Sequence, residues 1–389
     1  MPFHAARSRR AGPSYQLGDH GPAVAEIRSK LAILGLLPTG RDQPEEDEFD
    51  ETCDFAVRQF QQQRGLTIDG IVGPQTYRVL DEARWRLGDR ILSYTVSHPL
   101  VGDDVAQLQR RMLEMGFDCG RVDGIFGANT LRALREFQRN VGLNPDGTCG
   151  PSTFAALDRL VRTVTGGRPF ALRESELIHR SGPALAGKVL VIDPGLGPAD
   201  RKVMRLGNDE LPAAEVVHDI ARRIEGRLTA LGVTAYLSRG PETDLDETAR
   251  AEFANATGAD LLISLHVDEH SSPLAQGVAT FYYGNDRLDG YSAAGEKFAG
   301  LVQREIVART GLVNCQTHGK TWDILRRTRM PAVRVDIGYI TNAGDAARLG
   351  SRSFRDCVAE AVVVAVQRLY LPPDDDAPTG AMQLPALAH

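Results

Sequence analysis

The N-terminal part of the chain contains one residue pattern twice, and this repeat limits the folds that the chain can adopt. The first half of the pattern, Gly21, Val24, Ile27, Leu31 and Leu34, recurs as Gly102, Val105, Leu108, Met112 and Met115. The second half, Phe60-Gln61, Asp69-Gly70, Gly73-Pro74 and Thr76, recurs as Phe137-Gln138, Asp146-Gly147, Gly150-Pro151 and Thr153. Apolar residues three and four apart share one helix face, and Asp-Gly and Gly-Pro pairs favour turns. We therefore predict two small three-helix domains, at 15–94 and 95–163.

Residues 164–187 contain two Gly-rich stretches and are interpreted as a linker to a second kind of domain. After this segment, short apolar runs predict strands at Lys188–Asp193, Val233–Ser238, Asp260–Val267, Val278–Tyr283 and Ala332–Ile337. Between and after them, amphipathic segments predict helices at Glu215–Leu231, Asp246–Thr257, Tyr291–Arg309 and Phe354–Tyr370. Strand–helix alternation is typical of an α/β domain with a mostly parallel sheet and helices on both faces, here over residues 188–370. The fold class is thus α and α/β multidomain.

Composition and the chain ends exclude several classes of protein. With 45 Lys and Arg against 51 Asp and Glu, the net charge is −6, which argues against nucleic-acid binding. No apolar run approaches the roughly 18–20 residues of a membrane-spanning helix, and no apolar signal segment follows the basic residues of 1–14. The five cysteines are scattered and form no disulfide framework or structural zinc motif. We expect a cytoplasmic protein with disordered ends at 1–14 and 371–389.

The motifs of both parts resemble known cell-wall protein families. The repeat resembles the peptidoglycan-binding-like domain, although the first copy has Asp50-Glu-Thr-Cys53 where the second has Asp123-Gly-Ile-Phe-Gly127. Residues 188–370 resemble the zinc-dependent N-acetylmuramoyl-L-alanine amidases. The motifs that carry the second resemblance are Val191–Gly195, Leu237–Arg239, Arg250 with Ala254-Asn255, Ile263–His266 and Met330–Asn342. This family cleaves the amide between muramic acid and L-alanine. Its zinc is held by His, Glu and His, and a second Glu assists the reaction.

Carried onto this chain, the zinc-binding set of the family is incomplete. Leu196 stands where the first His would follow Asp-Pro-Gly, and Ala213 stands at the position of the Glu. His266 is the one ligand retained, and Asp336 replaces the catalytic Glu with a side chain one methylene shorter. Catalytic zinc sites use three protein ligands and one water, whose pKa the metal lowers to about 7. The resemblance therefore implies a pseudoenzyme without zinc or catalytic residues.

Two alternative activities stay open at this point. A rearranged zinc site could combine His266 with Glu210, His270 or His318, the last of which we place in a loop at Cys315–Gly319. The chain would then be an active N-acetylmuramoyl-L-alanine amidase. Alternatively, the repeats bind muramyl-peptide or peptidoglycan fragments, and the chain is a peptidoglycan-binding module.

The whole chain is similar to a family of cytosolic regulators that carry two such repeats before a degenerate amidase domain. The resemblance implies that it activates UDP-N-acetylglucosamine enolpyruvyl transferase, an enzyme of peptidoglycan precursor synthesis, under the control of a serine/threonine kinase. Thr379, in Asp374-Asp-Asp-Ala-Pro-Thr379-Gly, is the candidate phosphorylation site because no other Ser or Thr follows Phe354. A phosphate would add about −1.5 to −2 charge there and create a docking group for arginines.

Overall fold

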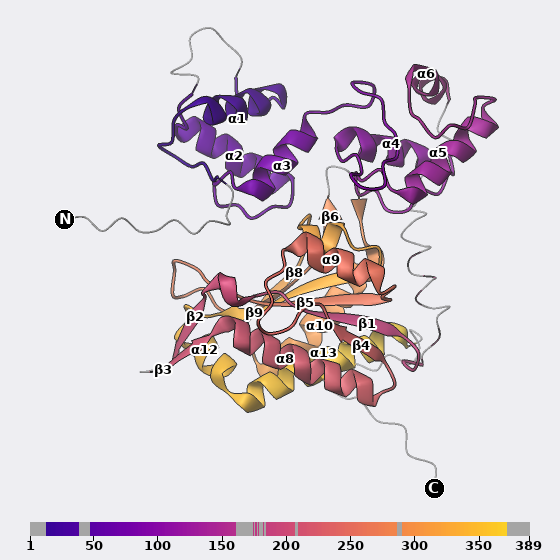
Figure 1. Cartoon of the computed structure of the whole chain (residues 1–389). Coiled ribbons are helices and arrows are strands. Elements are labelled where there is room, and N and C mark those ends of the chain that lie inside the picture. The colour runs from indigo at the N-terminus through magenta and orange to yellow at the C-terminus, as the bar shows by residue number, and fades with distance from the viewer. Residues whose placement is uncertain are drawn as a thin grey trace. The chain divides into compact units, whose positions relative to one another are not determined.

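The computed structural model describes residues 13–38, 47–160, 174, 176, 178, 182, 184–206, 209–285 and 290–371. Within these residues the chain forms two compact units, one made of Met1–Phe170 with Asn285–Gly290, the other of Ala171–Gly284 with Tyr291–His389. The first unit carries both repeats, and the second carries the α/β domain. Figure 1 shows the helices and strands of each unit.

Each repeat folds as three helices around its own apolar core, as predicted. The first consists of α1 (Pro22–Ile33), α2 (Glu51–Gln63) and α3 (Pro74–Ala83). The second consists of α4 (Asp103–Glu114), α5 (Ala128–Asn140) and α6 (Pro151–Arg159). Pro at the start of α1, α3 and α6 suits a helix start, where its missing N–H is not needed.

The recurring Gln, Asp-Gly and Thr residues form a buried hydrogen-bond network that fixes each turn. The carboxamide of Gln61 donates to Asp69 and to Thr76 and accepts from the amide of Gly70. The same three kinds of contact recur around Gln138, with Asp146 and Thr153. They recur again in the second repeat around Gln109, with Asp123 and Thr130. Because buried polar groups need partners, this motif has a structural role wherever it occurs.

The first repeat departs from this network at one place, which explains its sequence departure at Asp50. Arg28 stands where the second repeat has Gln109, and it donates to Asp50 and to the carbonyl of Glu48. The Asp50 carboxylate also caps α2 through the amide of Cys53. An Arg–Asp pair thus replaces the Gln–Asp–Thr network of the second repeat.

Two segments near the predicted domain boundaries pack against a different domain from the one expected from the sequence. Leu92, within the range predicted for the first domain, bridges to Cys149 and packs in the core of the second repeat. In the predicted linker 164–187, Glu174 accepts hydrogen bonds from Ser292 Oγ and the amide of Ala294. Ile178 joins the core of the α/β domain. These linker residues therefore belong to the second unit.

In the α/β domain the described residues form a seven-stranded, mostly parallel sheet, as predicted, with strand order β4-β1-β5-β9-β6-β7 and β8 paired to β6. Only the β6–β9 pair is antiparallel among the long strands. Their bounds are β1 (Val189–Pro194), β4 (Thr234–Leu237), β5 (Leu261–Asp268), β6 (Val278–Asn285), β7 (Gly290–Tyr291), β8 (Asn314–Lys320) and β9 (Ala332–Tyr339). A separate hairpin, β2 (Val203–Leu206) with β3 (Asp209–Pro212), precedes the first long helix.

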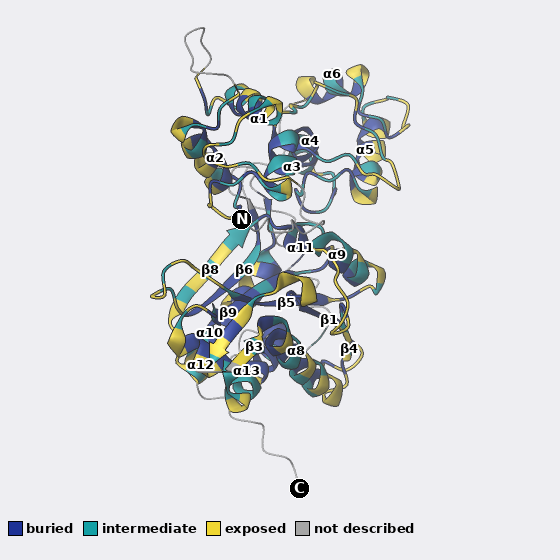
Figure 2. Cartoon of the chain, turned by 60° about the vertical axis from the view of Figure 1, so that its left-hand side comes forward, coloured by how far each residue is buried: buried dark blue, intermediate teal, exposed yellow. Residues whose placement is uncertain are grey.

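Helices cover both faces of this sheet, and each face has its own apolar core. The larger core joins the sheet to α8 (Ala213–Ala230), α10 (Ala293–Thr310) and α13 (Arg352–Tyr370). On the other face lie α9 (Glu247–Ala256) and the short α11 (Asp323–Arg326). The remaining helices are the short η1 (Pro198–Asp200) and α12 (Ala343–Gly350). Figure 2 shows the inner strands as buried and β8 as an exposed edge strand.

None of the described helices has the length and apolarity needed to cross a bilayer.

Candidate functional site

The candidate site lies at the C-terminal ends of β1, β5 and β9, on the sheet face that α9 and α11 cover. Strand register places Asp193 beside Ser264, Ser264 beside Arg334, and His266 beside Asp336. Alternate residues of a strand point to the same face, so Val191, Leu262 and Ala332, which pack against α9 and α11, identify that face. Apolar side chains thus give way to polar ones towards the strand ends, where ligand sites of parallel sheets lie.

Asp193 is the centre of a fully buried polar network. Its carboxylate accepts hydrogen bonds from Ser238 Oγ and Ser264 Oγ, each at 2.5 Å. Arg250, on α9, places Nε 2.9 Å from the same carboxylate. A buried carboxylate is stable only when its charge and its lone pairs find partners, and these residues supply both. The network therefore holds the ends of β1, β4 and β5 together.

His266, the retained family ligand, is bound into this network rather than left open. Its Nε2 lies 3.1 Å from Ser264 Oγ. Because the single hydrogen of that hydroxyl is donated to Asp193, Nε2 must carry a hydrogen and donate it to Ser264. Gly195 packs so closely on the ring that a Cβ at this position would overlap Nε2.

The imidazole of His266 is neutral as well as buried. Burial lowers its pKa well below the usual value of 6.5, and the nearby cations Arg334, Arg250, Lys202 and Arg239 lower the pKa further. A ring in the Nε2–H form has no lone pair at Nε2 to give to a metal, and its lone pair lies on Nδ1.

Leu196 and Ala213 are both buried, and both belong to the larger apolar core. Ala213 is the first residue of α8, and Leu196 follows the end of β1. Neither side chain has an atom that can bind a metal.

Both oxygens of Asp336 are engaged by a residue that sequence reasoning missed. Arg334, two positions earlier on β9, donates from Nε at 2.7 Å and from Nη2 at 3.2 Å. Its guanidinium also lies 3.8 Å from Glu247 and 4.2 Å from the ring centroid of Trp322. Burial raises the pKa of Asp336, and Arg334 opposes that rise. The one available signal was a cation inside the apolar run Ala332–Ile337.

The residues proposed for a rearranged metal site are not brought together. Glu210 is exposed on β3 and lies 3.7 Å from Arg205. His270 is exposed after β5, where its Nδ1 accepts from the amide of Ser272. His318 lies on strand β8, not in the expected loop, and its Nε2 is 2.7 Å from the Cys315 carbonyl. Across the described ranges, no three His, Cys, Asp or Glu side chains come close enough to hold a metal ion.

The residues present do not fit the zinc ion that the amidase fold implies. Two of the three ligand positions are hydrocarbon, which leaves the imidazole of His266 as the one side chain of this set with a lone pair to give. Asp336, the acidic side chain at the catalytic position, forms an ion pair with Arg334. Thr379, the candidate phosphorylation site, lies outside the described residues.

Family models match both parts of the chain. The model described as N-acetylmuramoyl-L-alanine amidase matches residues 190–368. The model described as putative peptidoglycan binding domain matches residues 20–80 and 101–157.

Individual relatives match either nearly the whole chain or about half of it. The chain is 47% identical over 393 residues to the N-acetylmuramoyl-L-alanine amidase CwlM of Mycobacterium tuberculosis, covering 98% of this chain and 96% of that protein. It is 32% identical over 179 residues to the N-acetylmuramoyl-L-alanine amidase LytC of Bacillus subtilis, covering 46% of this chain and 34% of that protein. Among solved structures, the amidase AmiC2 of Nostoc punctiforme is 28% identical, with a TM-score of 0.42 over 46% of this chain and 96% of that one.

Proposed function

This chain belongs to the N-acetylmuramoyl-L-alanine amidase family, with two peptidoglycan-binding domains before the amidase domain, and we propose that it is a non-catalytic regulator of peptidoglycan precursor synthesis in the cytoplasm. The observation that carries the proposal is the burial of Leu196 and Ala213 in the apolar core at two zinc-ligand positions. Without zinc, no bound water acquires a pKa near 7. A carboxylate acting alone supplies about 10²–10⁴-fold, whereas enzymes usually supply 10⁶-fold or more.

The proposed partner is UDP-N-acetylglucosamine enolpyruvyl transferase, and the proposed switch is phosphorylation of Thr379 by a serine/threonine kinase. This assignment follows from the resemblance to cytosolic regulators that carry two such repeats before an amidase-type domain, and the chain has that order of domains. The sequence around Thr379 agrees with it, because three aspartates and four prolines within residues 371–389 make this segment a poor contributor to an apolar core. A phosphate added to this acidic segment would favour docking on an arginine-lined surface of the transferase.

Metal content and hydrolysis test the non-catalytic part. We expect the purified full-length protein, dialysed against zinc and then against buffer, to retain no stoichiometric zinc and to release no L-alanine-linked peptide from peptidoglycan. The control is a zinc amidase of the same family carried through the same dialysis. One zinc per chain that is lost in His266→Ala, together with hydrolysis at a rate comparable to the control, would contradict the proposal.

A reconstituted transferase assay tests the regulatory part. We expect the kinase-treated full-length protein to raise the rate of enolpyruvyl transfer, and Thr379→Ala treated in the same way to have no effect. Thr310→Ala is the matched control, because Thr310 is a threonine on α10 far from the tail in sequence and should leave the activation intact. Equal activation by the untreated protein or by Thr379→Ala would refute the switch.

Peptidoglycan binding by the repeats is a second candidate function, favoured by the match of both repeats to the peptidoglycan-binding model. Co-sedimentation of the full chain with insoluble peptidoglycan tests it. Retention in the pellet at moderate ionic strength would support it, and full recovery in the supernatant would exclude it.

A further inference from the structure

The two repeats share a scaffold but differ in the space between their first and third helices. In the first repeat, Lys30 of α1 fills this space with its ammonium group. Nζ lies 2.8 Å from Glu26, 3.0 Å from Asp81 and 4.1 Å from the ring centroid of Tyr77. Only 5% of the Lys30 side chain is exposed. The first repeat therefore contains a complete ammonium site that is occupied by its own lysine.

This site stabilises the charged form of the lysine. Burial alone lowers the pKa of Lys30, but hydrogen bonds to Glu26, Tyr77 and Asp81 outweigh burial, and the net pKa is raised. The chemistry that achieves this is an aromatic face below the cation and carboxylates at its sides.

The second repeat keeps part of this site but holds its own cation in a different place. By the repeat alignment, Phe154 replaces Tyr77, Asp158 replaces Asp81, and Gln107 replaces Glu26. Arg111 replaces Lys30, but its Nη2 donates to the carbonyls of Leu157 and Leu160, each at 3.0 Å. These carbonyls end α6, so the guanidinium caps that helix instead of lying over Phe154.

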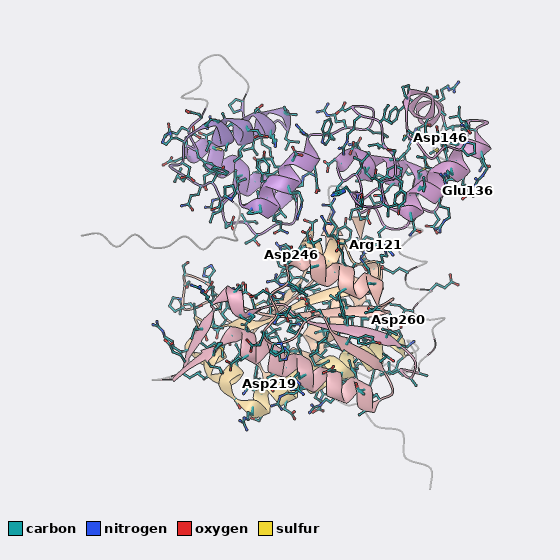
Figure 3. All side chains as sticks on the ribbon, viewed as in Figure 1. Arg121, Glu136, Asp146, Asp219, Asp246 and Asp260 are labelled. Atoms are coloured by element: carbon teal, nitrogen blue, oxygen red, sulfur yellow. The ribbon has the colours of Figure 1, made fainter. Side chains whose placement is uncertain are left out.

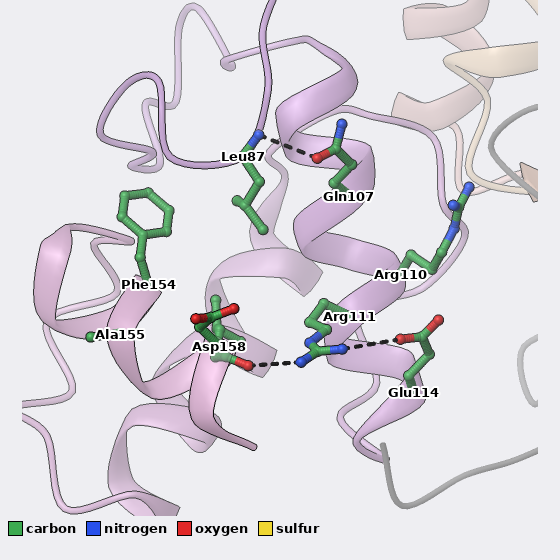
Figure 4. A pocket seen from close by; sticks show the side chains of 9 residues that line it. Leu87, Gln107, Arg110, Arg111, Glu114, Phe154, Ala155 and Asp158 are labelled. Atoms are coloured by element: carbon green, nitrogen blue, oxygen red, sulfur yellow. Dashed lines mark hydrogen bonds and ion pairs between the residues drawn. The ribbon is translucent and has the colours of Figure 1, made fainter. Parts of the chain in front are cut away.

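A cavity of about 580 Å³ lies between α4 and α6 as a result. Figure 4 shows Phe154 and Asp158 on the α6 side, while Arg110 points away from them on α4. Asp158 makes no ion pair within the part of the chain that the structure describes, in contrast to Asp81. The cavity is lined by Leu87, Gln107, Arg110, Arg111, Glu114 and Phe154, with Ala155, Leu157 and Asp158.

We propose that this cavity of the second repeat binds a primary alkylammonium group of another molecule in the place that Lys30 occupies in the first repeat. The ammonium lies over the ring of Phe154 and pairs with Asp158, and its alkyl stem packs against Leu87. Arg111 does not compete for this place, because its guanidinium is held by the two carbonyls and lies 3.9 Å from Glu114. Lysine side chains of proteins and the diamino acids of wall peptides both carry this group.

Titration of the full-length protein with short capped peptides, followed by NMR, tests the proposal. The probes are acetyl-Ala-Lys-Ala-amide, the same peptide with norleucine or with glutamate in place of lysine, and the same peptide with meso-diaminopimelate. We expect the lysine or the diaminopimelate peptide to bind about tenfold more tightly than the norleucine peptide. The tighter of the two amines identifies the source of the ligand. Equal binding of the norleucine peptide, tighter binding of the glutamate peptide, or no binding of either amine would overturn the proposal.

Variants within the cavity separate this site from general charge effects. Asp158→Asn should weaken amine binding about tenfold, and Gln107→Glu should strengthen it by restoring the second carboxylate. Arg111→Lys should abolish binding by supplying an internal ammonium, as in the first repeat. Glu136→Gln removes an exposed carboxylate from α5 of the same repeat (Figure 3) and should change nothing. Unchanged binding in both Asp158→Asn and Arg111→Lys, with folding verified by circular dichroism, would refute the assignment.

Discussion

Ser264 Oγ lies 3.1 Å from Nε2 of His266 and connects that imidazole to the buried carboxylate of Asp193. The serine hydrogen is donated to Asp193, so the histidine hydrogen must point to the serine. The retained ligand of the amidase fold has thereby become a member of a structural network. Two other ligand positions, Leu196 and Ala213, have joined the apolar core. Neither of these two side chains has an atom that can bind a metal, whereas the neutral imidazole of His266 keeps a lone pair on Nδ1.

Restoring the two missing ligands should restore zinc binding. We expect Leu196→His combined with Ala213→Glu to bind about one zinc per chain, because three protein ligands suffice for a tetrahedral site with one water. Zinc bound after dialysis, measured by inductively coupled plasma mass spectrometry, is the readout. The matched control is Leu196→Asn with Ala213→Gln, which adds polar groups of similar size but poor zinc ligands. A double variant that folds and stays free of zinc would show that the family alignment at these positions is wrong.

The ion pair between Asp193 and Arg250 should be essential for stability. Asp193→Asn leaves the guanidinium of Arg250 buried beside a neutral group, so we expect the free energy of unfolding to fall by about 3–5 kcal/mol. Urea unfolding followed by the fluorescence of Trp322, in a Trp85→Phe background, measures it.

Asp219, on α8 (Figure 3), provides the control for this comparison. It pairs with Arg223 and Arg355 but is one-third exposed, with 33% of its side chain accessible. Asp219→Asn should therefore cost less than about 1 kcal/mol. Equal losses in the two variants would mean that the Asp193 network adds nothing beyond a surface pair.

The fold could largely be predicted from periodicity, and the exceptions have physical causes. The strand at Asp260–Val267 is buried on both faces, so its apolar run was plain in the sequence. Strand β8, Asn-Cys-Gln-Thr-His-Gly-Lys, is an exposed edge strand. Its side chains are largely exposed and show no apolar alternation. The sequence therefore predicts a loop at Cys315–Gly319, whereas His318 lies on a strand.

The sequence predicts site residues only at the positions that the family motifs define. Leu196, Ala213, His266 and Asp336 follow from the motif positions. Arg334 pairs with Asp336 two positions along the same strand, which strand alternation allows, but its stacking on Trp322 depends on the segment that begins α11, which periodicity does not define. Nor does the sequence indicate that Ser264 lies between two buried charged or polar groups. Contacts across parallel strands join residues roughly 70 positions apart, beyond the reach of local patterns.

Protonation of His266 should destabilise the second unit in mild acid. Its pKa in the folded protein lies well below 6.5, so the unfolded chain binds more protons between the folded pKa and 6.5. The contribution of the neutral imidazole to the free energy of unfolding is fully present above pH 6.5. It decreases as the pH falls towards the pKa of His266 in the folded protein, by at most about 1.4 kcal/mol per pH unit. Urea unfolding at pH 7.5 and pH 5.5 measures the loss.

Substitution separates this effect from other titrations. His266→Gln should reduce the difference between the two pH values, since glutamine keeps a donor for Ser264 without titrating. His218 on α8 is half-buried, and its pKa is also lowered, first by burial and second by Arg239. His218→Gln is therefore the comparison. An unchanged pH dependence in His266→Gln would contradict a neutral, buried imidazole at this position.

Gly195 should be intolerant of a side chain because of His266. A Cβ at this position would overlap Nε2 of the ring, and the ring is held by Ser264 and cannot move away. We expect Gly195→Ala to lower the free energy of unfolding by about 1–3 kcal/mol. Adding His266→Ala removes the obstacle, so Gly195→Ala should cost less in that background, and the double-mutant cycle gives the coupling directly. Gly226→Ala on α8, where a Cβ meets open space, should instead stabilise by about 0.5–1 kcal/mol. An equal cost of Gly195→Ala with and without the imidazole would show that the backbone, rather than His266, requires glycine there.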